Sequence, residues 1–123
     1  MKPTILLVDD EVEEVAPLIG PLRDAGFNVV TARGGREAIT LLKTRSIQAV
    51  LCDLEMPGVG GYDVLAAVGS DPATQALPFI LGNLVWDESN WSKPAGGRTA
   101  DAHIPKPYTV RDVIGFMSRM LQS

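Results

Sequence analysis

The sequence of 123 residues contains a single cysteine, Cys52, which excludes a disulfide framework and a metal site built from thiolates. Cys52 lies within an apolar run, so we expect it in the core, and a lone thiol is consistent with a reducing cytoplasm. No apolar run approaches the roughly 18 residues that span a membrane, and no long apolar stretch typical of a secretory signal follows Met1. We therefore expect a cytoplasmic location and no membrane contact.

The sequence also lacks clusters of basic residues. Its 11 Lys and Arg side chains are scattered among 15 Asp and Glu, and the formal net charge is −4. Because binding to a phosphate backbone requires clustered positive charge, nucleic acid is not expected as a direct partner. A content of 46% hydrophobic and 21% charged residues is typical of a folded globular protein, and the length suits a single domain over residues 1–123.

Short apolar runs alternate with segments of helical periodicity, which indicates βα units around a parallel sheet. Strands are predicted at residues 5–8, 27–31, 47–52, 78–82 and 102–104. Helices are predicted at residues 11–25, 35–45 and 62–68, and a last helix begins at the capping residue Thr109. Residues 84–99 are expected to hold at most a short or irregular helix, and Trp86 and Trp91 in this segment are either core residues or a contact patch for a partner.

The first predicted helix contains two prolines, Pro17 and Pro21. Each removes a backbone donor and presses on the preceding turn. We therefore expect this helix to be kinked or to start late, and to end before Gly26.

Five strands alternating with about five helices favour an α/β doubly wound fold, in which ligands bind beyond the carboxyl ends of the strands. Acidic residues occupy two of these ends: Asp9 and Asp10 follow the first strand, and Asp53 follows the third. If these strands are parallel neighbours, three carboxylates lie within a few ångströms of one another, at a cost that a cation or a proton would relieve. Asn83 and Lys106 follow the last two strands and belong to the same edge.

These residue types suit phosphoryl chemistry. Carboxylates from two strands can hold Mg²⁺ and leave positions open for a phosphate, while Lys106 can pair with Asp53 or with a phosphoryl oxygen. Asp53 would then act as a nucleophile on phosphorus. Taken alone, the pair Asp9 and Asp10 favours a helix cap or a solvated turn over a metal site, and only the combination with Asp53 and Lys106 reverses this preference.

Three segments carry a resemblance to a known family: Ile-Leu-Leu-Val-Asp-Asp-Glu at 5–11, Leu-Cys-Asp-Leu-Glu-Met-Pro-Gly-Val-Gly-Gly at 51–61 and Ile-Pro-Lys-Pro-Tyr at 104–108. Over its whole length the chain resembles the receiver domains of two-component response regulators, for which Asp-x-x-Met-Pro-Gly-x-x-Gly is highly specific. The resemblance implies a five-stranded parallel sheet of flavodoxin-like order 2-1-3-4-5 with helices on both faces.

The resemblance also implies roles for single residues. Asp53 corresponds to the phosphoacceptor, and Lys106 to the family's lysine, which precedes a cis peptide bond at Pro107. The implied ligands of Mg²⁺ are Asp10 and Asp53 directly, Asp9 through water, and the backbone carbonyl of Glu55.

Three positions depart from the family pattern. Asn83 stands where receivers carry Ser or Thr, and it is either an amide donor to a phosphoryl oxygen or only a turn residue. Leu84 replaces the usual small residue and would crowd the space for the phosphate. His103, the only histidine, takes the place of the aromatic switch residue and is either a pH-sensitive substitute or an exposed imidazole.

The primary hypothesis is a regulatory domain rather than an enzyme, which takes a phosphoryl group from a histidine kinase or phosphotransfer protein onto Asp53 with Mg²⁺. Phosphorylation would change the binding of a downstream protein, or of an output domain absent from this chain, through the face formed by strands four and five. The alternative is a pseudo-receiver, a binding module that acts without phosphorylation. A Mg²⁺-dependent phosphohydrolase is disfavoured, because Glu55 stands where its second aspartate would be.

Overall fold

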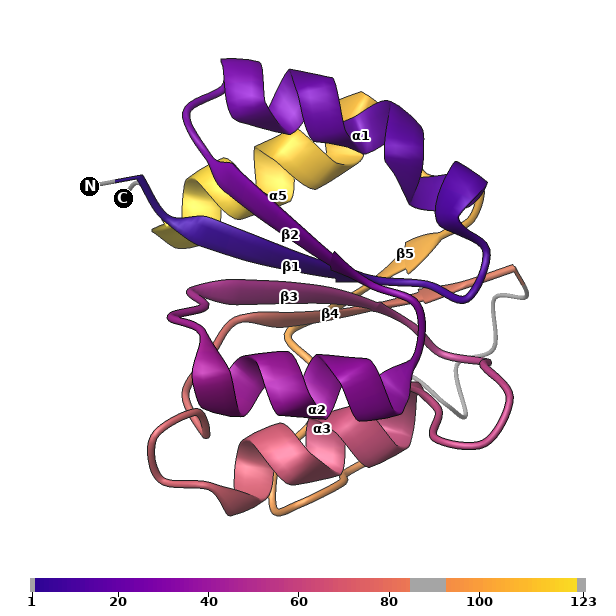
Figure 1. The fold of residues 1–123 in the computed structure, drawn as a ribbon, viewed down its shortest axis with the longest axis vertical. Coiled ribbons are helices and arrows are strands. Elements are labelled where there is room, and N and C mark those ends of the chain that lie inside the picture. The colour runs from indigo at the N-terminus through magenta and orange to yellow at the C-terminus, as the bar shows by residue number, and fades with distance from the viewer. Residues whose placement is uncertain (1, 85–92, 122–123) are drawn as a thin grey trace.

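The computed structural model describes residues 2–84 and 93–121, which form one parallel sheet between two layers of helices (Figure 1). The sheet order is β2-β1-β3-β4-β5, with each neighbouring pair parallel, so the predicted doubly wound order is confirmed. The strands are β1 (Thr4–Val8), β2 (Asn28–Ala32), β3 (Ala49–Asp53), β4 (Phe79–Asn83) and β5 (Ala102–Pro105).

Helices cover both faces of the sheet, as predicted. Helices α1 and α5 pack on one face, and α2 and α3 pack on the other (Figure 1). None of the helices in the described part of the chain combines the length and the apolar character needed to cross a membrane. The helices are α1 (Val12–Asp24), α2 (Gly35–Thr44), α3 (Gly61–Ser70) and α5 (Val110–Leu121).

The sequence suggested about five helices, and four lie in the described residues. Of the segment predicted to be irregular, residues 93–99 contain a single β-bridge between Ala95 and Arg98 and no helix. Trp86 and Trp91 lie outside the described residues, so the expectation that they form core or a contact patch remains a prediction.

The central strands form the rigid support of the fold. Every residue of β3 is buried, and so are residues 5–8 of β1, because helices cover the sheet on both sides. Side chains alternate between the two layers, so that Leu6 faces α2 and α3 while Leu7 faces α1 and α5. Each buried aliphatic side chain contributes about 1.5–3 kcal/mol relative to an exposed one. Cys52 is fully buried, which confirms its expected place in the core.

Most predicted elements are confirmed with shifts of one or two residues at their ends. The consequential shifts are at β3 and β4, which continue to Asp53 and Asn83 instead of ending one residue earlier. The ladder pairs Asp53 with Gly82 and Asn83 with Pro105. Backbone hydrogen bonds form whatever the polarity of the side chain. The apolar pattern of the sequence therefore predicted the ends of both strands one residue too early. Both polar residues therefore project from the hydrogen-bonded sheet.

Helix α1 tolerates its two prolines without a late start. It runs over 13 residues from Val12, one residue after the predicted beginning, and Gly26 follows its end with φ of 100°. Pro17 is exposed and Pro21 is half-buried, while the apolar side of the helix carries the buried Val15, Leu18 and Leu22. Four residues separate the prolines, so they share one side of the helix, where water can hydrate the carbonyls that lose a donor.

Replacing Pro17 by alanine should stabilise the protein by about 1–3 kcal/mol, because alanine restores a backbone hydrogen-bond donor in the middle of the helix. The greater flexibility of the unfolded alanine variant offsets part of this gain. Urea denaturation measures the change. Pro72→Ala, in the exposed turn after α3, is the control and should give no stabilisation. An unchanged or lower midpoint for Pro17→Ala would contradict the prediction.

Candidate functional site

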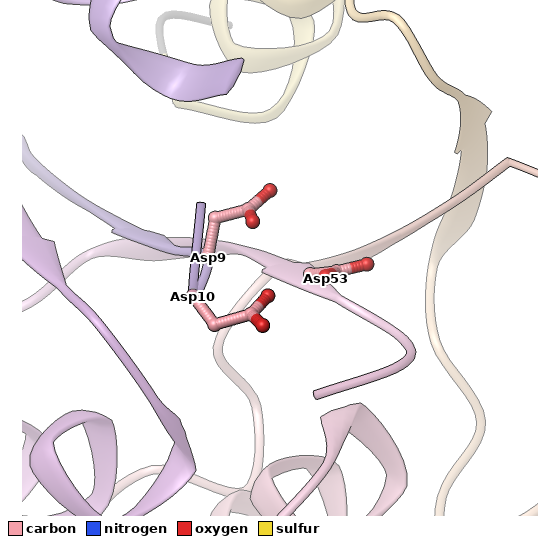
Figure 2. A group of neighbouring side chains, drawn as sticks. All are labelled: Asp9, Asp10 and Asp53. Carbon is pink, nitrogen blue, oxygen red and sulfur yellow. The ribbon is translucent and has the colours of Figure 1, made fainter. Parts of the chain in front are cut away.

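The carboxyl ends of β1 and β3 bring three aspartates together (Figure 2). The register places Val8 opposite Cys52, so that Asp9 and Asp53 come next on neighbouring strands. One carboxylate oxygen from each of Asp9, Asp10 and Asp53 lies within 4.8 Å of the others. Asp9 is fully buried and Asp53 is 5% exposed, whereas Asp10 is exposed. This arrangement offers a hard cation several oxygen donors and an open side.

Burial makes two of these carboxylates reluctant to ionise. Burial raises the pKa of Asp53 to about 6, with Asp9 adding to the rise while Lys106 and the backbone of Glu55 oppose it. Burial also raises the pKa of Asp9, although its Oδ1 accepts a hydrogen bond of 2.9 Å from the Glu11 N–H and Lys106 lies beside it. The cluster carries more negative charge than its surroundings neutralise, which is the condition that favours a bound cation.

Lys106 is the cation of the site, and three carboxylates surround it. Its Nζ lies 3.1 Å from Asp9 Oδ2 and 3.3 Å from Asp53 Oδ1, and it forms a further ion pair with Glu14 Oε2. The Lys106 side chain is 5% exposed. Burial disfavours its charge, but the hydrogen bonds to Glu14 and Asp9 outweigh burial and raise its pKa. Lys106 is therefore fixed in its charged form.

The sequence interpretation missed Glu14. Its only signal was an acid in the first turn of the helix that follows the Asp-Asp pair, and such acids are common there because they favour the helix dipole. In the structure Glu14 belongs to α1 and reaches the lysine that follows β5.

A cleft of about 130 Å³ opens beside Asp53. A single water molecule needs a cavity of only about 10–15 Å³, so the cleft has room for a group several times larger than water. Leu84 lines the cleft, but its side chain is 70% exposed and leaves this space open, so the expected crowding is not observed. The lining residues are Asp10, Glu11, Glu14, Asp53, Glu55, Asn83, Leu84 and Lys106.

His103 does not join this cleft. It lies on β5 and lines a separate groove between β5 and α5, together with Phe116 and Arg119. Burial lowers the pKa of His103, which favours the neutral imidazole. The structure thus places Asn83 at the acidic cleft and His103 on another surface.

Gly82 and Tyr108 form a close contact next to the lysine. The peptide bond between Lys106 and Pro107 is cis, as predicted, and the Tyr108 ring centroid lies 5.7 Å from Lys106 Nζ. A Cβ atom at Gly82 would lie 1.9 Å from Tyr108 Oη and 2.5 Å from its ring, so the tyrosine occupies the place of a side chain at position 82. Gly82 pairs with Asp53 in the ladder, which puts this contact at the base of the site.

Gly82→Ala should destabilise the protein by about 1–3 kcal/mol, because the added methyl group overpacks against Tyr108. Thermal and urea denaturation measure the cost. The same substitution in a Tyr108→Leu background should cost much less, since the ring and hydroxyl are gone. Equal costs in both backgrounds would show that Tyr108 is not the obstacle.

Stability of the metal-free protein should depend on pH through Asp53. Since folding raises the pKa of this carboxyl, its contribution to stability is complete below the ordinary value of 3.8 and is lost as pH rises through about 6. In EDTA, the free energy of unfolding of Asp53→Asn should therefore rise by roughly 2–3 kcal/mol relative to that of the wild type as the pH increases from 4 to 7. Denaturation at several pH values measures this difference. Asp24→Asn, on the exposed end of α1, should track the wild type, and parallel curves for Asp53→Asn would refute the assignment.

Comparison with known proteins identifies the family. Residues 5–116 match the response regulator receiver domain family. Protein PilH of Pseudomonas aeruginosa is 31% identical over 96 residues, which cover 76% of this chain and 79% of PilH. The transcriptional regulatory protein CpxR of Escherichia coli is 34% identical over 119 residues, which cover 96% of this chain but 49% of CpxR, so the chain spans about half the length of that relative. The chain belongs to the receiver domains of two-component response regulators, as its sequence motifs implied.

Solved structures agree with this fold. The chemotaxis protein CheY4 of Vibrio cholerae matches with a TM-score of 0.85 at 23% identity, over 98% of this chain and all of CheY4. The receiver domain of the sensor histidine kinase PA1611 of Pseudomonas aeruginosa matches with a TM-score of 0.85 at 19% identity over the full length of both chains, and its structure contains a magnesium ion coordinated in the active site cleft.

Proposed function

We propose that this receiver domain accepts a phosphoryl group on Asp53 from the phosphohistidine of a histidine kinase or phosphotransfer protein, with Mg²⁺ as cofactor. The observation that carries the proposal is the position of the Asp53 carboxylate, which opens into the cleft beside two further aspartates and 3.3 Å from Lys106. A nucleophile, a metal-binding group and a fixed cation thus meet at one point of the sheet.

The metal site fits the residues that are present. Asp9, Asp10 and Asp53 offer oxygen donors close enough to share one ion. Burial raises the pKa of both Asp9 and Asp53, and a bound cation would favour their charged forms. Glu55 lines the same cleft, and its backbone carbonyl is the proposed further ligand. Bound Mg²⁺ would neutralise negative charge on the transferring group.

In the proposed transfer, an Asp53 carboxylate oxygen attacks phosphorus, an acyl phosphate forms on Asp53 and the P–N bond of the phosphohistidine breaks. The electron pair of that bond returns to the imidazole, which leaves as the neutral donor side chain after protonation by solvent. Lys106 turns toward the new phosphoryl oxygens, and the Asn83 amide can donate a hydrogen bond to one of them in place of a hydroxyl. The cleft volume of about 130 Å³ accommodates the group without movement of the strands.

The role is regulatory rather than that of a turnover enzyme. Phosphorylation adds about −2 charge next to Lys106 and Asn83, at the ends of the neighbouring strands β4 and β5. We propose that this charge shifts the conformation of the β4–β5 face and changes affinity for a downstream protein or an output domain. His103, on β5, is the proposed residue of that face which senses the change. The proposal includes a cytoplasmic location, where kinase donors act.

Incubation with Mg²⁺ and acetyl phosphate should add one phosphoryl group to the wild-type protein, and beryllofluoride should bind at the same place. Intact-mass spectrometry detects the adduct, and peptide mapping locates it. Asp53→Asn should abolish the adduct, and omission of Mg²⁺ should greatly reduce it. Asp24→Asn is the control and should label like the wild type. Labelling that persists in Asp53→Asn would disprove the assignment of the acceptor.

A pseudo-receiver is the second candidate, favoured by the missing hydroxyl at Asn83 and by the distance of His103 from the acidic cleft. Binding to a partner decides between the two. If the wild type, Asp53→Ala and Asp53→Glu bind a partner equally, with or without a phosphodonor, the domain acts without phosphorylation. Sustained hydrolysis of small phosphate esters would instead favour a phosphohydrolase.

A further inference from the structure

We propose that Glu14 is a positioning residue of the phosphoryl site, which holds Lys106 before phosphorylation and competes with the incoming phosphoryl group for it. This inference rests on the proposed function, because it concerns the same reaction at Asp53. It assigns a role to a side chain that lies outside the three-aspartate cluster of Figure 2.

Lys106 is already surrounded by carboxylates. A lysine ammonium has three N–H donors. In the structure Lys106 Nζ has three carboxylate partners, at 3.1 Å from Asp9 Oδ2, at 3.3 Å from Asp53 Oδ1 and in the ion pair with Glu14 Oε2. A phosphoryl oxygen that pairs with this ammonium therefore has to compete with the carboxylates already beside it.

The three carboxylates differ in how easily they can release the lysine. Asp9 and Asp53 belong to the buried ends of β1 and β3, and their side chains are 0% and 7% exposed. Glu14 has a longer side chain that is 29% exposed, on the first turn of α1. Asp53 loses its carboxylate charge when the acyl phosphate forms. Of the two carboxylates that remain beside Lys106, Glu14 can turn to water, whereas Asp9 would stay buried. Exchange of Glu14 for the phosphoryl oxygen is thus the rearrangement of lowest cost.

Glu14 also adds negative charge to the cleft. Glu14 lines the same cleft as Asp53, and the hydrogen bond from Lys106 lowers the pKa of Glu14, so its carboxylate is charged. An anionic phosphodonor therefore meets this negative charge as well as a lysine that is already occupied. Both effects raise the cost of phosphorylation in the wild type.

The chain provides a matched control in Glu13. It lies in the same turn of α1 and is exposed, and among the described residues it forms no ion pair and does not line the cleft. Glu13→Gln and Glu14→Gln remove the same charge from adjacent positions, so long-range electrostatics affects both variants. Only Glu14→Gln removes a charge that is paired with Lys106.

The test is a titration with beryllofluoride at saturating Mg²⁺. Glu14→Gln should bind it about tenfold more tightly than the wild type, the size expected for one charged hydrogen bond. Glu13→Gln should change binding by less than about twofold, as expected for an exposed charge. Without Mg²⁺ or beryllofluoride, the NMR signal of the Lys106 ammonium protons should exchange with water faster in Glu14→Gln than in the wild type.

The outcomes separate this inference from the proposed function. If the wild type binds beryllofluoride but Glu14→Gln binds it equally or more weakly, or gains no more than Glu13→Gln, the competition is overturned while phosphorylation stands. An unchanged Lys106 ammonium signal in Glu14→Gln overturns the contact itself. If the wild type neither binds beryllofluoride nor labels at Asp53, the proposed function fails and the competition fails with it.

Discussion

The site depends on one buried cation among carboxylates. The strands β1 and β3 hold Asp9 and Asp53 on neighbouring backbones, and the packing of the sheet prevents them from separating. Lys106 neutralises part of their charge from the end of β5, and its own burial makes it dependent on them. Removing Lys106 would leave the buried Asp9 and Asp53 carboxylates without their cation. The packing of the sheet and the position of the Asp53 carboxylate are therefore consequences of the same arrangement.

Sequence patterns predicted the fold well because its signals are local. Apolar runs and helical periodicity located all the strands and helices of the described residues, and the strand ends identified Asp9, Asp10, Asp53 and Lys106 as neighbours. The family motifs added the strand order and the cis bond, which no periodicity specifies. The predicted ends of β3 and β4 were each one residue too early, because backbone hydrogen bonds extend these strands to the polar residues Asp53 and Asn83.

The contacts that the sequence did not predict are contacts between distant elements. Glu14 and Lys106 are 92 positions apart, and Gly82 and Tyr108 meet only because β4 and the segment after β5 lie side by side. Nothing in either local pattern marks these residues, since an acid in a first helical turn and a glycine in a strand each have ordinary explanations. His103 likewise lines the groove between β5 and α5 and not the acidic cleft. Only the tertiary structure shows which of these two surfaces the residue belongs to.

The contact of Gly82 with Tyr108 also constrains how this chain can vary during evolution. Any side chain at position 82 would occupy the volume of the tyrosine, and loss of the tyrosine would leave a void beside Lys106. Single substitutions at either position are thus disadvantageous, while a compensating pair would preserve the packing. Descendants of this sequence should accordingly keep both residues or replace both, so the two positions form one heritable unit at the base of the site.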